Sequence, residues 1–208
     1  MKDLLLVFLI VFTSDWVLGQ IRVEAFVGDD EPVFDVFWVK PFEKNSSFQY
    51  LSRNKFRLPS YSNQSPQFST LNVLSYQLGK TGLGLAIAAT ATNAEFQTRA
   101  GIQFQRVRPK EWLIYAIGST SLGRSGDFRG LLIFQITPKL TKHWRWFNRL
   151  EWVSALGYGD YHRFSQGILK EGVQIRRWQF GFGTELLWLG RSFASVKQNW
   201  GLFVACEF

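Results

Sequence analysis

The chain has 208 residues, a formal net charge of +8, one cysteine and two histidines. A single cysteine excludes an intrachain disulfide and a cysteine-based metal cluster, and two histidines argue against a histidine-rich metal site, so we expect no metal and no cofactor. With 17% aromatic and 19% charged residues the composition is not that of a disordered chain. The length predicts one domain, or at most two small ones.

The first 19 residues have the pattern of an export signal. Lys2 precedes an apolar run from Leu4 to Phe12, which has the length of a signal-peptide core and is too short to span a bilayer as a helix. Val17 and Gly19 provide a cleavage site before Gln20. We therefore predict a signal peptide at residues 1–19 and a mature domain at residues 20–208; the alternative is a short buried helix at the start of the domain.

From residue 20 onward, apolar and polar side chains alternate with a period of two, and turn residues separate the segments. In QIRVEAFVG, for example, Ile21, Val23 and Ala25 alternate with Arg22 and Glu24. The same pattern recurs in the segments 33–42, 47–58, 69–78, 83–92, 95–107, 112–122, 127–137, 143–155, 164–175, 179–189 and 199–208. It predicts an all-β protein, an antiparallel up-and-down β-barrel of about 12 strands.

Alternation alone does not say which face meets water. A soluble barrel turns its apolar face inward, whereas a transmembrane barrel turns it toward lipid and keeps a polar interior. In two segments, residues 69–78 and 112–122, the pattern does not identify the lipid-facing set at all.

Three features favour the membrane. The tryptophans of the mature chain are expected near strand ends, where interfacial girdles fall: Trp38, Trp112, Trp144, Trp146, Trp152, Trp178, Trp188 and Trp200. Connections are expected to alternate, short after residues 42, 78, 107, 137 and 175 and longer after 58, 122, 155 and 189. Counting back from a periplasmic C-terminus gives an even number of strands, as single-chain bacterial barrels require.

The last ten residues, NWGLFVACEF, end in an aromatic residue after an alternating apolar strand. Trp200, Leu202, Val204 and Phe208 fit this pattern, and Cys206 is an unusual occupant of a lipid-facing position. The pattern resembles the C-terminal insertion signal of gram-negative outer-membrane β-barrel proteins, and the layout of the whole mature chain is similar to the small 12-stranded monomeric porins. The resemblance implies an exported, multi-pass outer-membrane barrel that contacts outer-membrane lipid and meets the barrel assembly machinery during insertion.

Charged residues of these strands must point into the lumen or sit at a rim, because a charge facing lipid at mid-bilayer costs about 2–4 kcal/mol. The predicted basic lining comprises Arg53, Lys55, Arg57, Arg99, Arg129, Arg145 and Arg149, and the predicted acidic lining comprises Asp35, Glu151 and Glu185. Basic groups outnumber acidic ones, which favours a channel for small, possibly anionic solutes. The alternative is a closed structural or accessory barrel in which the same charges pair with each other.

A rim enzyme is the third interpretation. His162 has Ser154, Asp160 and Ser165 nearby, as outer-leaflet lipid-modifying enzymes would require. On a regular strand Asp160 shares the face of His162, whereas the odd offset between His162 and Ser165 places those two on opposite faces. A histidine beside an aspartate in a loop is usually only solvated, and we expect no enzymatic activity.

Two further stretches invite other interpretations. Lys142 to Trp146 interleaves basic and aromatic residues, but in an exported barrel this is better explained as interfacial tryptophans around a lumen arginine, and we expect no nucleic-acid partner. The polar segment 59–68 is the best candidate for a loop that folds into the lumen or contacts a partner.

Overall fold

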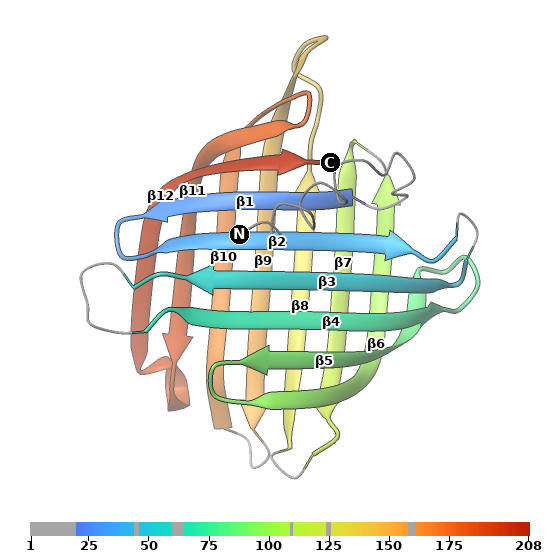
Figure 1. The fold of residues 1–208 in the computed structure, drawn as a ribbon, viewed down its shortest axis with the longest axis vertical. Helices are drawn as coiled ribbons and strands as arrows, with labels where there is room; N and C mark the ends of the chain where they lie inside the picture. Colours follow the sequence, from blue (N-terminus) through green and yellow to red (C-terminus); the bar gives the residue numbers. More distant parts are fainter. Residues whose placement is uncertain (1–19, 44–45, 60–64, 109, 124–125, 158–160) are drawn as a thin grey trace, which may run out of the picture.

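The computed structural model describes residues 20–208 except 44–45, 60–64, 109, 124–125 and 158–160. Within these residues, 12 strands form one closed antiparallel barrel in which each strand pairs with the next and β1 pairs with β12. Figure 1 shows the strands, whose bounds are β1 Gln20–Gly28, β2 Pro32–Pro41, β3 Phe48–Arg57, β4 Gln67–Gln77, β5 Leu83–Thr92, β6 Phe96–Arg108, β7 Trp112–Ser121, β8 Asp127–Ile136, β9 Trp144–Gly157, β10 Tyr161–Ile175, β11 Trp178–Leu189 and β12 Ser195–Glu207. A short 3₁₀ helix, η1 Arg191–Phe193, lies between β11 and β12. The predicted fold class is confirmed. The predicted signal peptide lies outside the described residues.

The chain ends close the barrel. The backbone N–H of Phe208 donates to the carbonyl of Ile21 at 2.8 Å, which continues the β1–β12 ladder to the last residue. We call the end where β1 joins β2 the loop end, and the end where β2 joins β3 the turn end. None of the helical structure in the described residues is long and apolar enough to cross a membrane.

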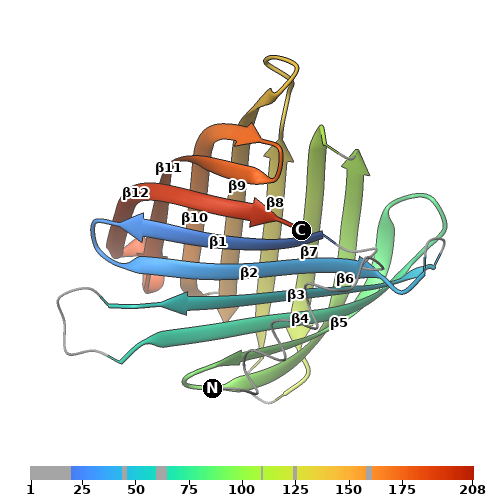
Figure 2. The same cartoon turned by 45° about the horizontal axis from the view of Figure 1, so that its top comes forward.

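The front and back walls of the barrel cross each other, as the tilt of strands in a closed barrel requires. Strands β1–β5 run across the front of the molecule, and β8–β10 run upright behind them (Figures 1 and 2). Side chains from β3 therefore reach partners on β9 across the interior, as the contact between Arg53 and Glu151 at 2.7 Å demonstrates. Side chains from opposite walls therefore fill part of the lumen and limit the space that is left for a solute.

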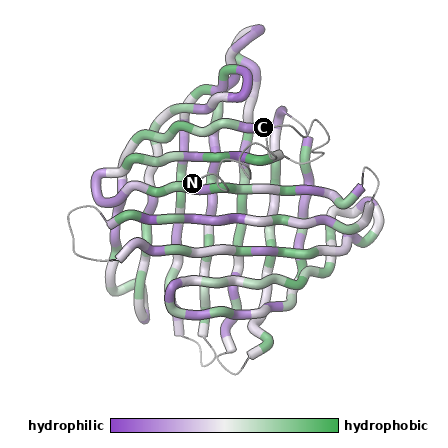
Figure 3. The backbone as a smooth tube through the Cα atoms, viewed as in Figure 1, coloured by the Kyte–Doolittle hydropathy of each residue, from purple (hydrophilic) through white to green (hydrophobic). Residues whose placement is uncertain are grey.

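The two faces of each strand differ in hydropathy, and hydrophilic and hydrophobic residues alternate along the chain in Figure 3. Outward residues are apolar and exposed, for example Ile87 at 62% and Leu202 at 65%. Inward charged residues are buried, for example Glu24 at 2%. Apolar residues outside and charged residues inside are the arrangement of a transmembrane barrel, and a soluble barrel has the opposite arrangement. The two segments with no predicted lipid face follow the same rule, since Val73 and Ser75 point inward on β4 and Tyr115 and Ile117 on β7.

One polar patch interrupts the apolar exterior on β3 and β4. The Ser52 hydroxyl donates to the Asn72 side-chain oxygen at 3.0 Å, and the Asn72 amide donates to Thr70 at 3.1 Å. Because these groups bond to each other, their cost of facing lipid is reduced.

Two supporting expectations were wrong. Connections do not alternate regularly in length: the turn-end connections 42–47 and 137–143 are among the longer ones, and the loop-end connection after β9 is only 158–160. The connection after β9 is short because β9 and β10 extend further toward the loop end than the sequence pattern predicts. Trp152 and Trp200 lie well inside their strands rather than at strand ends, because β9 continues to Gly157 and β12 begins at Ser195.

Candidate functional site

A group of buried charges crosses the middle of the barrel. Arg53 on β3 donates to Asp35 on the neighbouring β2 and to Glu151 on the opposite wall. Glu151 also accepts from the Arg149 Nε at 2.6 Å. All four side chains are buried, and the guanidinium of Arg53 is therefore shared between two carboxylates from different walls.

A second group continues this arrangement on the strands that close the barrel. Glu24 on β1 accepts from Arg22 at 2.5 Å and from Lys170 on β10. Arg22 also donates to the Gln179 side chain at 3.1 Å. We call the two groups together the ion-pair layer, which consists of Arg22, Glu24, Asp35, Arg53, Arg149, Glu151 and Lys170. Burying charges is costly, and the layer is stable because each charge has partners of opposite sign.

Toward the loop end the charges continue as a looser set. Arg57 contacts Glu185 at 2.7 Å and Glu31 at 2.5 Å, and Lys55 lies 3.9 Å from Glu185 and 4.0 Å from Asp35. The two pairs with Glu185 connect β3 with β11 across the lumen. They extend the ion-pair layer toward that rim.

The other half of the interior is apolar, which the sequence analysis did not predict. Inward side chains from six strands form one cluster, which we call the apolar cluster: Phe37, Leu51, Val73, Ala86, Ala88, Tyr115, Ile117, Leu131 and Ile133. This half departs from the general rule that the interior of a transmembrane barrel is polar. Inward side chains from the front strands and from β7 and β8 meet across the lumen and fill this half as in a soluble core. Arg149 lies over the Phe37 ring at 5.3 Å and joins the two halves.

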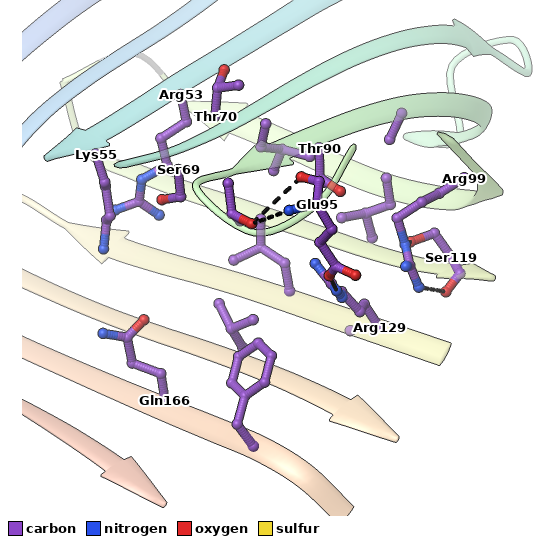
Figure 4. A pocket seen from close by; sticks show the side chains of 18 residues that line it. Arg53, Lys55, Ser69, Thr70, Thr90, Glu95, Arg99, Ser119, Arg129 and Gln166 are labelled. Carbon is purple, nitrogen blue, oxygen red and sulfur yellow. Dashed lines mark hydrogen bonds and ion pairs between the residues drawn. The ribbon is translucent and has the colours of Figure 1, made fainter. Parts of the chain in front are cut away.

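Two cavities lie on opposite sides of this filled zone. The loop-end cavity has a volume of about 300 Å³, and Figure 4 shows Arg53, Lys55, Arg99, Arg129, Glu95 and Gln166 around it. The turn-end cavity has a volume of about 500 Å³ and is lined by Arg22, Gln49, Gln77, Gln135 and Arg149, among others. Within the described residues the two cavities share no lining side chain. The ion-pair layer contributes Arg53 to the loop-end cavity and Arg22 and Arg149 to the turn-end cavity, and the apolar cluster likewise contributes Leu131 to the first and Phe37 to the second. The ion-pair layer and the apolar cluster therefore both lie between the two cavities.

An arginine cluster at the loop-end cavity surrounds one acid that the sequence analysis missed. Asp127 on β8 is fully buried and contacts Arg99 at 2.5 Å, Arg129 at 3.1 Å and Arg163 at 3.3 Å. Arg129 also contacts Glu95 at 3.2 Å. The period-two pattern could have identified Asp127, because it lies two residues before the inward Arg129.

The structure places the other predicted residues as follows. Arg145 points inward near the turn end, where its guanidinium donates to the backbone carbonyls of Lys110 and Thr137. Of the predicted segment 59–68, residues 60–64 lie outside the described part of the chain. The C-terminal residues Trp200, Leu202, Val204 and Phe208 are all exposed. Among the described residues, no group of three or more His, Cys, Asp or Glu side chains could hold a metal ion.

The parity argument about His162 was wrong. The register between β9 and β10 shifts between His162 and Phe164, so β10 contains one extra residue there. This bulge brings His162 and Ser165 onto the same face, and the His162 Nε2 lies 2.8 Å from the Ser165 hydroxyl. Asp160, the third residue considered, lies outside the described residues.

Comparison with known proteins gives a likeness in structure. No protein-family model matches the chain, and no curated protein sequence matches it. Among solved structures, a KdgM porin in complex with disordered oligogalacturonate has a TM-score of 0.51 at 12% identity, covering 91% of this chain and 99% of that one. The fold is that of 12-stranded outer-membrane porins. A NanC porin gives a TM-score of 0.53 at 7% identity, covering 91% of this chain and 98% of that one. At these identities the likeness is one of fold.

Proposed function

We propose that this protein is an outer-membrane channel for small solutes, with a preference for anions. The observation that carries the proposal is the arrangement of the lumen, in which two cavities with basic side chains in their lining are separated by the ion-pair layer and the apolar cluster. The porin fold supports a transport role, and the apolar exterior supports the outer membrane as its location. Passage would be diffusive, with no covalent step and no cofactor.

The preference for anions follows from the chemistry of the cavities. Three arginines share Asp127 at the loop-end cavity, so their charge is not fully neutralised there. An arginine fork can bind a carboxylate or phosphate in two-point fashion, so an anionic solute can replace Asp127, Asp35 or Glu151 as a partner. The solved KdgM complex contains an oligogalacturonate, an acidic saccharide, which supports the same solute class.

The test is the reversal potential of the refolded mature chain in a planar bilayer across a salt gradient. We expect a conductance that is selective for anions, and a smaller selectivity in Arg129→Glu. The matched control is Lys142→Glu, which makes the same charge change at an exposed position in the turn-end connection 137–143. Cation selectivity of the unmodified chain would overturn the preference for anions.

A closed structural barrel is the second candidate, and the ion-pair layer together with the apolar cluster favours it. In this case neither the unmodified chain nor variants of the layer would conduct. Silence of the folded Arg53→Ala/Glu151→Ala variant would therefore favour the closed barrel over the channel.

We further propose that residues 1–19 direct export and that Trp200, Leu202, Val204 and Phe208 form an insertion signal for the barrel assembly machinery. The outward exposure of the four C-terminal side chains supports this proposal, because a partner can reach them along one edge of β12 before β1 closes the barrel. Phe208→Ala is expected to lower accumulation in the outer membrane in cells while the purified chain still refolds in detergent. Unchanged accumulation would contradict it.

A further inference from the structure

A chain of three side chains at the loop end takes no part in the proposed transport. The Ser154 hydroxyl on β9 lies 2.8 Å from the Ser165 hydroxyl on β10. Ser165 in turn lies 2.8 Å from the His162 Nε2. The other ring nitrogen of His162, Nδ1, lies 2.8 Å from the carbonyl oxygen of Gly190. The order is therefore hydroxyl, hydroxyl, imidazole, carbonyl.

These side chains are on the outer surface of the barrel. Ser165 pairs with Ser154, and both alternate with inward neighbours, since Val153 and Gln166 line the loop-end cavity. His162 pairs with Leu156, which is exposed on the outside. The β10 bulge creates this arrangement, because without the extra residue His162 would point into the lumen.

The connection after β11 fixes the bulge in place. The Gly190 N–H donates to the carbonyl of Arg163, the bulged residue, at 3.1 Å, and the Gly190 carbonyl accepts from His162. Gly190 has a φ of 76°, a left-handed conformation that glycine adopts without strain. Phe193 of η1 packs on the His162 ring with centroids 4.0 Å apart. The imidazole is thus positioned on two sides.

The carbonyl of Gly190 determines the direction of the hydrogen bonds. A carbonyl can only accept, so Nδ1 of the neutral ring carries the hydrogen and Nε2 is the acceptor. Ser165 therefore donates to His162, and its oxygen accepts from Ser154. This leaves lone pairs of the Ser154 oxygen free, while its proton has a path to the imidazole.

Exposure distinguishes the two serines. Ser165 is buried, at 1% exposure, whereas Ser154 is partly exposed. Only Ser154 can therefore meet a substrate. Its partner Ser165 pairs with Trp188, which lies one residue before the end of β11 and 5.2 Å from the ring of Trp152. A tryptophan near a strand end favours the boundary between acyl chains and headgroups, where the ester bonds of lipids lie.

We propose that Ser154, Ser165 and His162 form an acyl-transfer site on the lipid-facing surface, with membrane-lipid acyl esters as its substrate class. The Ser154 oxygen bonds to the ester carbonyl carbon as its proton passes to Ser165 and the Ser165 proton passes to His162 Nε2. The ester C–O bond then breaks, and the departing alkoxide takes a proton from the Ser165 hydroxyl, which regains one from His162 Nε2, and leaves as an alcohol. Water then hydrolyses the acyl-serine, passing a proton to His162 by way of Ser165, which gives a fatty acid and restores Ser154.

The test uses a long-chain alkyl fluorophosphonate, which reacts covalently with activated serine hydroxyls, on the folded full-length barrel in detergent micelles. We expect labelling of Ser154, located by peptide mass spectrometry and absent after unfolding. His162→Asn and Ser165→Ala are expected to slow the labelling about 100-fold, the size of a general-base effect. The control His143→Asn changes the other histidine, which is exposed near the turn end, and should leave the rate unchanged.

Ser165→Thr separates a proton path from a packing role, because it keeps the hydroxyl. Restoration of labelling by threonine supports the relay, and hydrolysis of p-nitrophenyl acyl esters should follow the same order among the variants. A folded barrel that is not labelled would overturn the proposal. Labelling at Ser154 that is equally fast in His162→Asn would overturn it as well.

Discussion

The two halves of the barrel interior differ in chemistry at the same depth. On one side β2–β5, β7 and β8 contribute the apolar cluster, and on the other β1–β3, β9 and β10 contribute the ion-pair layer. Both halves fill space between the front and back walls of the barrel. They differ in whether water or a solute could take the place of a side chain's partner, and we use this difference to separate the residues that stabilise the barrel from those that line a path for solutes.

Neither water nor a solute can replace the packing contacts of the apolar cluster. Its side chains gain their stability from close packing, and a solute or water that entered would lose that packing without compensation. Ion pairs behave differently, because water or an anion can take the place of a carboxylate beside Arg53. We therefore infer that the apolar half holds the walls together and that the charged half is where a path can open.

The largest expected effect is on the ion-pair layer itself. Glu151→Gln removes a charge that Arg53 and Arg149 share, and leaves both buried without that partner. The free energy of unfolding is expected to fall by about 3–5 kcal/mol, measured by denaturant titration of the barrel in detergent micelles.

A matched substitution at an exposed pair is the control for this prediction. Arg108 and Glu111 lie 3.1 Å apart with exposures of 67% and 48%, so Glu111→Gln is expected to cost about 0–1 kcal/mol. Equal losses in the two variants would contradict the importance of the buried layer.

The second prediction concerns the apolar cluster. Ile133 is fully buried, and Ile133→Ala is expected to lower the free energy of unfolding by about 2–5 kcal/mol because it leaves a cavity between the walls. Ile133→Val, which removes one methylene, should cost about 0.5–1.5 kcal/mol in the same titration. A negligible effect of Ile133→Ala would show that the apolar side chains are not packed as described.

The smallest expected effect is the redistribution of charge at the loop-end cavity. In Arg99→Gln the Asp127 carboxylate keeps Arg129 and Arg163, so the barrel should remain folded. The reversal potential in a salt gradient should move modestly away from anion selectivity, since one basic group of the cavity is lost. A shift toward greater anion selectivity would contradict the assignment of Arg99 to the conducting path.

The alternation of apolar and charged residues was enough to predict the strands and, where charges are present, their inward face. Arg22 and Glu24, or Arg53 and Lys55, identify the inward face because a charge cannot face lipid at low cost. The apolar cluster was out of reach, since Leu51 or Tyr115 looks the same on a lipid-facing and on a core-facing position. Its existence depends on which inward side chains meet across the lumen, which is a property of the closed sheet.

The same limit applies to contacts between distant strands and to irregularities within one strand. The pairing of Arg53 with Glu151 becomes visible only when β3 and β9 face each other across the lumen. The single extra residue at the β10 bulge moves His162 to the opposite face of the strand. The regular alternation of FSQGILKEGVQI, which begins after the bulge, gives no indication of this change. The regular strands could be predicted from the sequence. The β10 bulge could not, and it is the bulge that brings His162 and Ser165 together.

The most direct test of the account is the single-channel conductance of Arg53→Ala/Glu151→Ala beside the unmodified chain and Ile133→Ala, all refolded in the same planar bilayer. Removing both members of the pair avoids an unpaired Glu151 and widens the charged half. The account predicts a larger conductance for the double variant and an unchanged conductance for Ile133→Ala. A double variant that conducts no better than the unmodified chain, or a conductance increase in Ile133→Ala alone, would contradict the ion-pair layer as the constriction.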